Sequence, residues 1–258
     1  NKCLVINNSI FIPVILLIGL FLFSFSYISK ENENDSLNVL VCSKTEGYRH
    51  DNIKIGIAGF RTLAAKKKWK MTTTEDAAYF NNKFLSKIDV VVFFNTTGDV
   101  LNSSEEIALE AFIKNGGGFL GIHAAADTEY DWPFYQELIA AHFASHPPTQ
   151  RARLIVHQET NHPAIGHLGN EWSLRDEWYS FKEPLKSHAT LLMEVDDSSL
   201  YGKIPLTESH PIAWAHEKFG GRAIYTGIGH TVEQFSDPVY LEHITRSIEW
   251  VGENVVKK

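Results

Sequence analysis

Three of the twelve histidines lie in segments that follow short, apolar, β-prone runs. These are His50, His123 and His230. Histidine is the side chain best suited to metal ligation or proton transfer near neutral pH. Ligands of an open parallel sheet bind beyond the carboxyl ends of its strands, so side chains at those ends come together. We therefore expect the three histidines to bind a divalent metal such as zinc or, without a metal, to share proton transfers.

His123 carries the most specific signal of the three. It lies in GGGFLGIHAAAD, residues 116–127, which reads as a helix end, a buried strand and a tight turn into small residues. The pattern is typical of a nucleophile elbow, in which a strained turn projects one side chain into a site. A serine or cysteine at the apex would indicate acyl transfer, whereas histidine indicates a general base, a hydrogen-bond donor or a metal ligand. The structural alternative is a histidine that caps the following helix.

A glycine-rich turn and a carboxylate extend the expected catalytic set. His230 lies in GIGHT, where Gly227 and Gly229 let the backbone turn sharply and approach a ligand closely. Asp127 closes the elbow segment, four residues after His123. We expect His230 and Asp127 to act with His123, although a helix-capping role for His230 stays open.

A second carboxylate comes from the segment RDEWYSF. Adjacent side chains of an extended segment point in opposite directions, so we expect only one of Asp176 and Glu177 to face a given site. We prefer Glu177, as ligand or base, and the alternative is an ion pair with a cation such as Arg175. His142 and His146 share one face of a predicted helix, but no HExxH pattern accompanies them, so a zincin-like site is not supported.

Aromatic and polar side chains near the same strand ends are candidates for substrate binding. Tyr48, Arg49 and His50 form a trio able to stack on a ring, pair with an anion and move a proton. Aromatic residues can form a platform for a sugar ring, although they are more often core residues. The expected substrate-binding residues are Tyr48, Arg49, Thr97, Asp99, Trp132 and Tyr179.

The elements that must position these residues alternate between strand and helix patterns. This alternation predicts an α/β fold with a three-layer, doubly wound, mostly parallel sheet and extra β elements in the second half. The capping-box spacing of Ser103 and Glu106 predicts the start of a helix that ends at Asn115. Strands are expected at Leu37–Cys42, Lys70–Thr74, Asp89–Phe94, Phe119–Ile122, Arg151–His157, Thr190–Val195, Pro211–Glu217 and Arg222–Thr226, and further helices from Ile53, over Trp132–Phe143 and over Leu241–Val251.

Composition and the N-terminal region limit the class and location of the protein. The 258 residues are 44% hydrophobic and carry a net charge of −7, which gives no general attraction for nucleic acid. The apolar run Ile10–Ile28 predicts a signal peptide or membrane anchor over residues 1–30, and hence an exported protein that is periplasmic, extracellular or membrane-anchored. Residues 37–254 then form one domain with a single cysteine, Cys42. A homodimer stays open.

These motifs, in order, resemble the ThuA-like (trehalose utilisation) family. The matching stretches are GYRHDNI, TTGDVL, GGGFLGIHAAADT, DWPFY, HFASHPPTQ, RDEWYSF, HPIAWAHEKFGGRAIYTGIGHT and the closing IEW. The family is similar in fold to class I glutamine amidotransferases, so the resemblance implies a flavodoxin-like sheet. It places His123 where that superfamily has its nucleophilic cysteine and His230 near the triad histidine. The family tends to have glycine before the HF segment, whereas this chain has Ala140, Ala141 and His142.

The resemblance implies a role in carbohydrate metabolism. Glutamine hydrolysis through a thioester is excluded on chemical grounds, because His123 cannot replace a thiol nucleophile. We expect metal- or histidine-assisted hydrolysis or isomerisation of a disaccharide or a 3-keto glycoside. The alternative is a non-catalytic sugar-binding or accessory module.

Overall fold

The computed structural model describes residues 2, 36–201 and 209–253. The expected signal peptide or anchor lies, except for Lys2, outside these residues and stays a prediction. Within the described ranges no helix has the length and apolar character that a membrane crossing needs. The described residues from Ser36 to Glu253 belong to one compact unit.

A nine-stranded sheet forms the centre of this unit, in the order β2-β1-β3-β4-β11-β10-β9-β6-β7. Neighbouring strands are parallel from β2 to β11 and antiparallel from β11 to β7. The parallel strands are β1 (Asn38–Cys42), β2 (Lys70–Thr74), β3 (Val90–Phe94), β4 (Gly118–Ile122) and β11 (Ala223–Thr226). The antiparallel extension contains β6 (Gln150–Val156), β7 (Glu171–Asp176), β9 (Thr190–Val195) and β10 (Pro211–His216). The expected α/β sheet with a parallel core and extra strands is confirmed.

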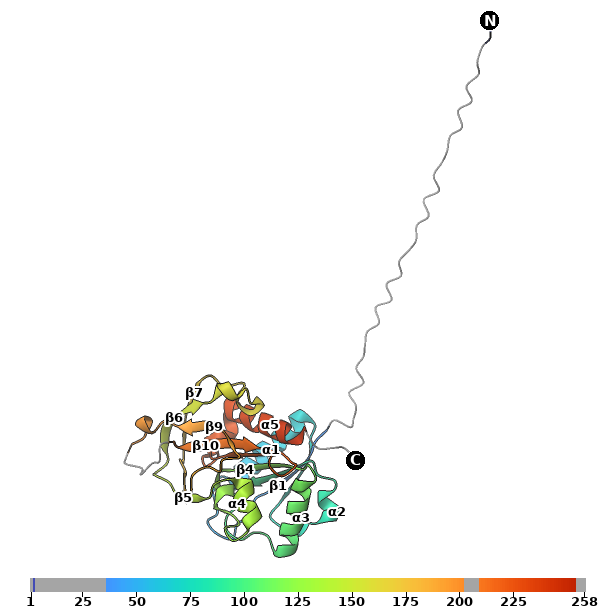
Figure 1. The fold of residues 1–258 in the computed structure, drawn as a ribbon, viewed down its shortest axis with the longest axis vertical. Coiled ribbons are helices and arrows are strands. Elements are labelled where there is room, and N and C mark those ends of the chain that lie inside the picture. The colour runs from blue at the N-terminus through green and yellow to red at the C-terminus, as the bar shows by residue number, and fades with distance from the viewer. Residues whose placement is uncertain (1, 3–35, 202–208, 254–258) are drawn as a thin grey trace. The chain divides into compact units, whose positions relative to one another are not determined.

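Helices cover both faces of the sheet, as Figure 1 shows. The helices are α1 (Ile53–Lys67), α2 (Asn82–Leu85), α3 (Ser103–Lys114), α4 (Pro133–Ile139) and α5 (Pro238–Gly252). Because side chains alternate along a strand, β1 sends Val39 and Val41 into the core beneath α1 and α5, and Leu40 and Cys42 into the core beneath α3 and α4. The wholly buried β3 fits its continuous run of valine and phenylalanine.

Two helix boundaries differ from the sequence prediction. The N-cap of α3 is Asn102, whose side chain accepts hydrogen bonds from the backbone while Glu105 completes the capping box. The expected pair Ser103 and Glu106 is therefore wrong by one residue, because asparagine is an equally good cap in the position before. Helix α4 ends at Ile139, since Ala140 adopts a left-handed conformation with φ of 66°. The chain then forms β5 (Phe143–Ser145), which pairs with β8 (Ser180–Phe181).

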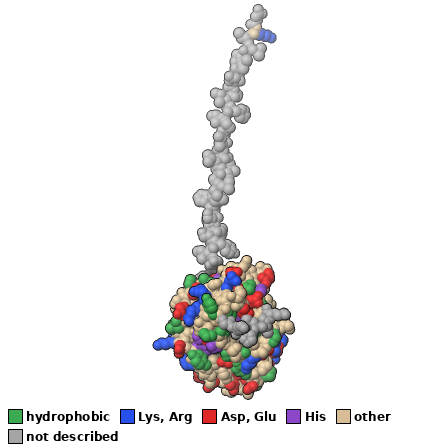
Figure 2. All heavy atoms as spheres, turned by 90° about the vertical axis from the view of Figure 1, so that its left-hand side faces the viewer, with side chains coloured by type: hydrophobic (Ala, Val, Ile, Leu, Met, Phe, Trp, Pro, Cys, Tyr) green, Lys and Arg blue, Asp and Glu red, His purple; other side chains and the backbone are tan. Residues whose placement is uncertain are grey.

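Acidic and basic side chains are interspersed on the face of the unit shown in Figure 2.

Cys42, the one free cysteine of the described residues, is buried in β1, and burial raises the pKa of its thiol to about 12. This thiol is therefore part of the core, and its burial and raised pKa make it unsuited to act as a nucleophile.

Candidate metal centre

The elbow after β4 is strained in the way that its sequence predicts. His123 has φ of 50°, a left-handed conformation that is uncommon for a residue with a Cβ. Its Nδ1 donates a hydrogen bond to the carbonyl of Gly227, 2.8 Å away, and its own carbonyl accepts one from the Tyr225 hydroxyl. Because a carbonyl can only accept, Nδ1 carries a proton, so Nε2 is the ring nitrogen that can act as a metal ligand.

The three predicted histidines meet at this elbow. Their ring centroids are 5.0 Å apart for His50 and His123, 5.2 Å for His123 and His230, and 5.3 Å for His50 and His230. Oε2 of Glu177 lies 3.4 Å from Nε2 of His123 and 3.3 Å from Nδ1 of His230. One ligand atom from each of the four residues lies within 4.8 Å of the others. We call these four residues the His/Glu cluster.

Burial sets the charge of the His/Glu cluster. It lowers the pKa of His50 to about 2, with smaller contributions from the neighbouring histidines, and it also lowers the pKa of His230. Burial raises the pKa of Glu177, but the imidazoles of His123, His230 and His146 more than offset this and hold it below its usual range. His50 and His230 are therefore neutral and Glu177 ionised near neutral pH, which are the protonation states that metal ligation requires.

The donor atoms fit a divalent cation. Nδ1 of His50, Nε2 of His123 and Nδ1 of His230 are buried, and each is without a hydrogen-bond partner among the described residues. Two imidazole nitrogens on one tetrahedral zinc ion, at about 2.1 Å each, are about 3.4 Å apart. The ligand atoms, which lie within 4.8 Å of one another, would therefore move closer by up to about 1.4 Å to bind zinc, and the ion would satisfy three nitrogens that are costly to bury unpaired.

The turn that carries His230 is held by a carboxylate that sequence reasoning set aside. Asp176 is fully buried and accepts hydrogen bonds from the backbone N–H groups of Glu177, Gly229 and His230 at 2.8 to 3.0 Å. Of these two adjacent carboxylates only Glu177, the one preferred from the sequence, contributes a ligand atom to the His/Glu cluster, whereas Asp176 bonds to the backbone. On the opposite side, the Asn52 amide donates to the carbonyl of Gly229 at 2.6 Å.

His146 is a further member of the site, which the sequence analysis considered only as a partner of His142 in a zincin-like pair and rejected. Its Nδ1 lies 2.9 Å from Oε1 of Glu177, the carboxylate oxygen that faces away from the other histidines. His142, its predicted partner on a helix face, instead bonds to the carbonyl of Thr128 and stacks on Tyr130. The helix ends before either residue, so the two side chains diverge.

Two of the expected substrate-binding residues contact the His/Glu cluster directly. The ring centroids of Tyr179 and His123 are 4.2 Å apart, and those of Tyr48 and His50 are 4.9 Å apart. The side of the cluster at Tyr48 is open, because Tyr48 is 64% exposed. Asp127 lies at the end of the elbow segment, where it accepts a hydrogen bond from the Tyr130 hydroxyl at 2.6 Å rather than contacting a histidine.

The structure places the other expected substrate-binding residues away from the cluster. Arg49 forms an exposed ion pair with Glu75, and the hydroxyl of Thr97 donates to the carbonyl of Tyr48. Trp132 packs in the core beneath α3 and α4. Asp99 belongs to a separate acidic group with Glu106 and Glu129. Of these, only Thr97 supports the cluster, by holding the loop of Tyr48.

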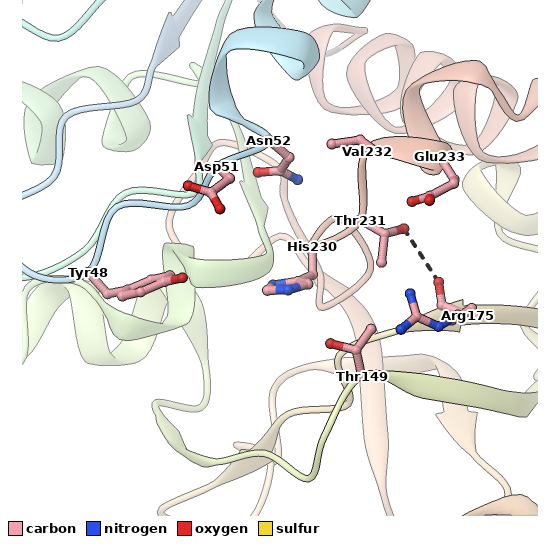
Figure 3. A pocket seen from close by; sticks show the side chains of 9 residues that line it. All are labelled: Tyr48, Asp51, Asn52, Thr149, Arg175, His230, Thr231, Val232 and Glu233. Carbon is pink, nitrogen blue, oxygen red and sulfur yellow. Dashed lines mark hydrogen bonds between the residues drawn. The ribbon is translucent and has the colours of Figure 1, made fainter.

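A pocket of about 220 Å³ opens beside the cluster and is shown in Figure 3. His230 is shared between the two, so a molecule in the pocket would contact the candidate metal centre. The wall comes from the loop of Tyr48, from the end of β7 and from the segment after His230.

The fold and the cluster define a doubly wound α/β protein with a histidine and carboxylate centre at the carboxyl ends of its parallel strands. The chain belongs to the ThuA family, described as trehalose utilisation, whose profile matches residues 38–251. The family expected from the sequence motifs is thus confirmed.

Solved structures agree on the fold. A ThuA-like protein from Bacteroides uniformis has a TM-score of 0.72 and 21% identity, over 84% of this chain and 91% of its own. Another, from Parabacteroides merdae, has a TM-score of 0.69 and 16% identity, over 86% and 92%. A β-galactosidase from Bacillus circulans sp. alkalophilus has a TM-score of 0.56 and 12% identity, over 84% of this chain and 31% of its own. Among curated protein sequences none matches significantly. The flavodoxin-like fold is confirmed.

Proposed function

We propose that this protein is an exported carbohydrate-active enzyme that hydrolyses or isomerises a disaccharide or a 3-keto glycoside at the His/Glu cluster. One observation carries the proposal: three buried imidazole nitrogens without partners among the described residues converge on the carboxylate of Glu177. A structural role would leave these nitrogens bonded to backbone or side-chain groups of the protein. Ligation of a cation accounts for the arrangement at least cost.

The chain's residues fall into distinct tasks in this proposal. His50, His123, His230 and Glu177 would hold a divalent metal such as zinc, which supplies Lewis-acid polarisation of a sugar carbonyl or hydroxyl. Nδ1 of His123 holds the carbonyl of Gly227 and so keeps Nε2 aimed into the site. His146 holds the outer oxygen of Glu177 and, with 38% of its side chain exposed, connects the carboxylate to solvent.

The same residues allow a reaction without a metal. His230 is neutral near pH 7 and half-buried at the pocket wall, so its ring can accept a proton from a hydroxyl or from the carbon next to a sugar carbonyl. Glu177, held ionised, then stabilises the imidazolium that forms, because its Oε2 lies 3.3 Å from Nδ1 of His230.

Metal content and turnover together test the proposal. The full chain is expected to retain about one zinc per molecule after dialysis, whereas H123A and E177Q lose it, and to turn over a member of a panel of disaccharides and 3-keto glycosides. The matched control is H157Q, since His157 forms a His–Glu contact with Glu159 at a different place in the fold. Absence of bound metal together with unchanged turnover in H123A would contradict the proposal. Saturable sugar binding without a product would favour the non-catalytic sugar-binding module.

Export is proposed from the apolar run Ile10–Ile28. Residues 1–36 fused to a reporter enzyme that is active only outside the cytoplasm should give an active reporter in a bacterial host. Activity equal to that of the leaderless reporter would contradict export.

A further inference from the structure

The pocket beside His230 contains polar groups that no protein partner satisfies. The guanidinium of Arg175, the carboxylates of Asp51 and Glu233 and the hydroxyls of Tyr48 and Thr149 line it, and none of these five groups has a hydrogen bond or ion pair with another described residue. An exposed charged group without a partner is ordinary. Five such groups on one concave wall, from segments far apart in the sequence, indicate a surface shaped for a ligand.

The composition of the wall favours a neutral polyhydroxylated ligand over an anion. Two carboxylates outnumber the one guanidinium, and Glu177 adds negative charge behind His230. Arg175 can only donate hydrogen bonds and ionised Asp51 and Glu233 can only accept them, whereas each sugar hydroxyl does both. The exposed ring of Tyr48 adds an apolar face of the kind on which a sugar ring stacks.

The arrangement also sets the size of the ligand. In Figure 3 His230 lies between Tyr48 and Arg175, with Thr149 below it, so a ligand that contacts both ends passes over the imidazole. The volume of about 220 Å³ is below the roughly 300 to 1,000 Å³ of pockets that enclose drug-sized molecules. One sugar ring fits such a volume, and a second ring must project into solvent.

We infer that this pocket is a subsite for one neutral sugar ring, in which Arg175 anchors the ring hydroxyls and Tyr48 stacks on its face, while the second ring of a disaccharide stays outside. The inference rests on the proposed carbohydrate function and adds the selectivity of its site. The subsite would select the sugar ring that it binds by that ring's hydroxyls. It would accept different groups in place of the second ring, because that part of the ligand lies outside the pocket.

Calorimetric titration of the full chain with trehalose and with methyl α-glucopyranoside tests this. The two dissociation constants should agree within about threefold, since the second ring makes no contacts in the pocket. R175A should weaken both about tenfold or more, because it removes hydrogen bonds from a charged donor. Y48A is the second variant, and it should weaken the binding of both sugars by a similar factor, because it removes the ring on which the sugar stacks. R151A is the matched control: Arg151 pairs across the strands with Arg175 but does not line the pocket.

The outcomes separate this inference from the proposed function. Binding by the wild type that R175A and Y48A leave unchanged overturns the subsite and leaves the carbohydrate function standing. Trehalose affinity more than tenfold above that of methyl α-glucopyranoside overturns the one-ring assignment. If neither sugar nor its 3-keto form binds the wild type, the proposed function fails, and the subsite fails with it.

Discussion

The buried carboxylate of Asp176 accepts a hydrogen bond from the backbone N–H of His230 at 3.0 Å. The same carboxylate accepts the N–H groups of Glu177 and Gly229. One side chain at the end of β7 therefore fixes two candidate metal ligands that are more than fifty residues apart in the chain. This relationship explains how an antiparallel extension of the sheet contributes to a site at the ends of parallel strands.

D176N should weaken metal binding. The amide replaces one acceptor oxygen by a donor, so at least one of the three N–H groups loses its partner and the turn of His230 shifts. We expect zinc affinity to fall about 10- to 100-fold, the usual range for residues that orient metal ligands, measured by competition with a chelator. The control is E171Q, which also removes one negative charge from β7 but at a side chain that is 63% exposed. Equal zinc affinities in D176N and E171Q would show that Asp176 does not position the ligands.

The strained elbow predicts a difference between two substitutions of His123. H123A and H123G both remove the imidazole and should lose zinc equally. The left-handed backbone, with φ of 50°, favours glycine over a residue with a Cβ by about 1 to 2 kcal/mol. Urea unfolding should therefore show H123G to be the more stable variant. A less stable H123G would mean that the elbow relaxes when the imidazole is removed.

His146 should act on metal affinity without acting on stability. Its Nδ1 lies 2.9 Å from Oε1 of Glu177 and so orients the carboxylate, while 38% of its own side chain is exposed. H146Q should lower zinc affinity about tenfold and leave the urea midpoint close to that of the wild type. H157Q removes a comparable His–Glu contact elsewhere and should change neither quantity. A large loss of stability in H146Q would assign His146 to the fold instead.

Glu129 should make stability depend on pH. Burial raises the pKa of this carboxyl from about 4.5 to about 7, although it accepts hydrogen bonds from the N–H groups of Val100 and Leu101. The folded chain thus keeps a proton that the unfolded chain releases earlier. The stability contribution is complete below about pH 4.5, declines as pH rises towards 7 and is lost above it, by up to about 3 kcal/mol.

E129Q keeps an acceptor oxygen and cannot ionise. Its unfolding free energy relative to the wild type should therefore increase between pH 5 and pH 8, measured in urea at both values. Because other titrating groups contribute equally to both proteins, the difference isolates Glu129. A difference that stays flat between the two pH values would refute the raised pKa of Glu129.

The parallel half of the fold could be predicted because its elements carry strong local signals. Lys70–Thr74 and Thr190–Val195 have the predicted bounds, and the continuous apolar run before Asn95 is a strand buried on both faces. The elbow was predictable for a related reason: Gly121, two residues before His123, and the three alanines after it are typical of a tight turn with small neighbours. The α3 cap was off by one residue, since both Asn102 and Ser103 satisfy the same rule.

The sequence by itself determined the family, the alternation of strands and helices, and the meeting of His50, His123 and His230, since residues after parallel strands share one edge of a sheet. It favoured Glu177 over Asp176 but could not bring Glu177 to that edge, because Glu177 follows the antiparallel strand β7. Only the tertiary structure decided the roles of His146, Asp176 and Arg175. His146 reaches Glu177 through the pairing of β5 with β8, strands of three and two residues that leave no periodic signal. Asp176 and Arg175 act through the end of an antiparallel edge strand. Such contacts depend on where distant segments pack, and no local pattern of residues encodes that position.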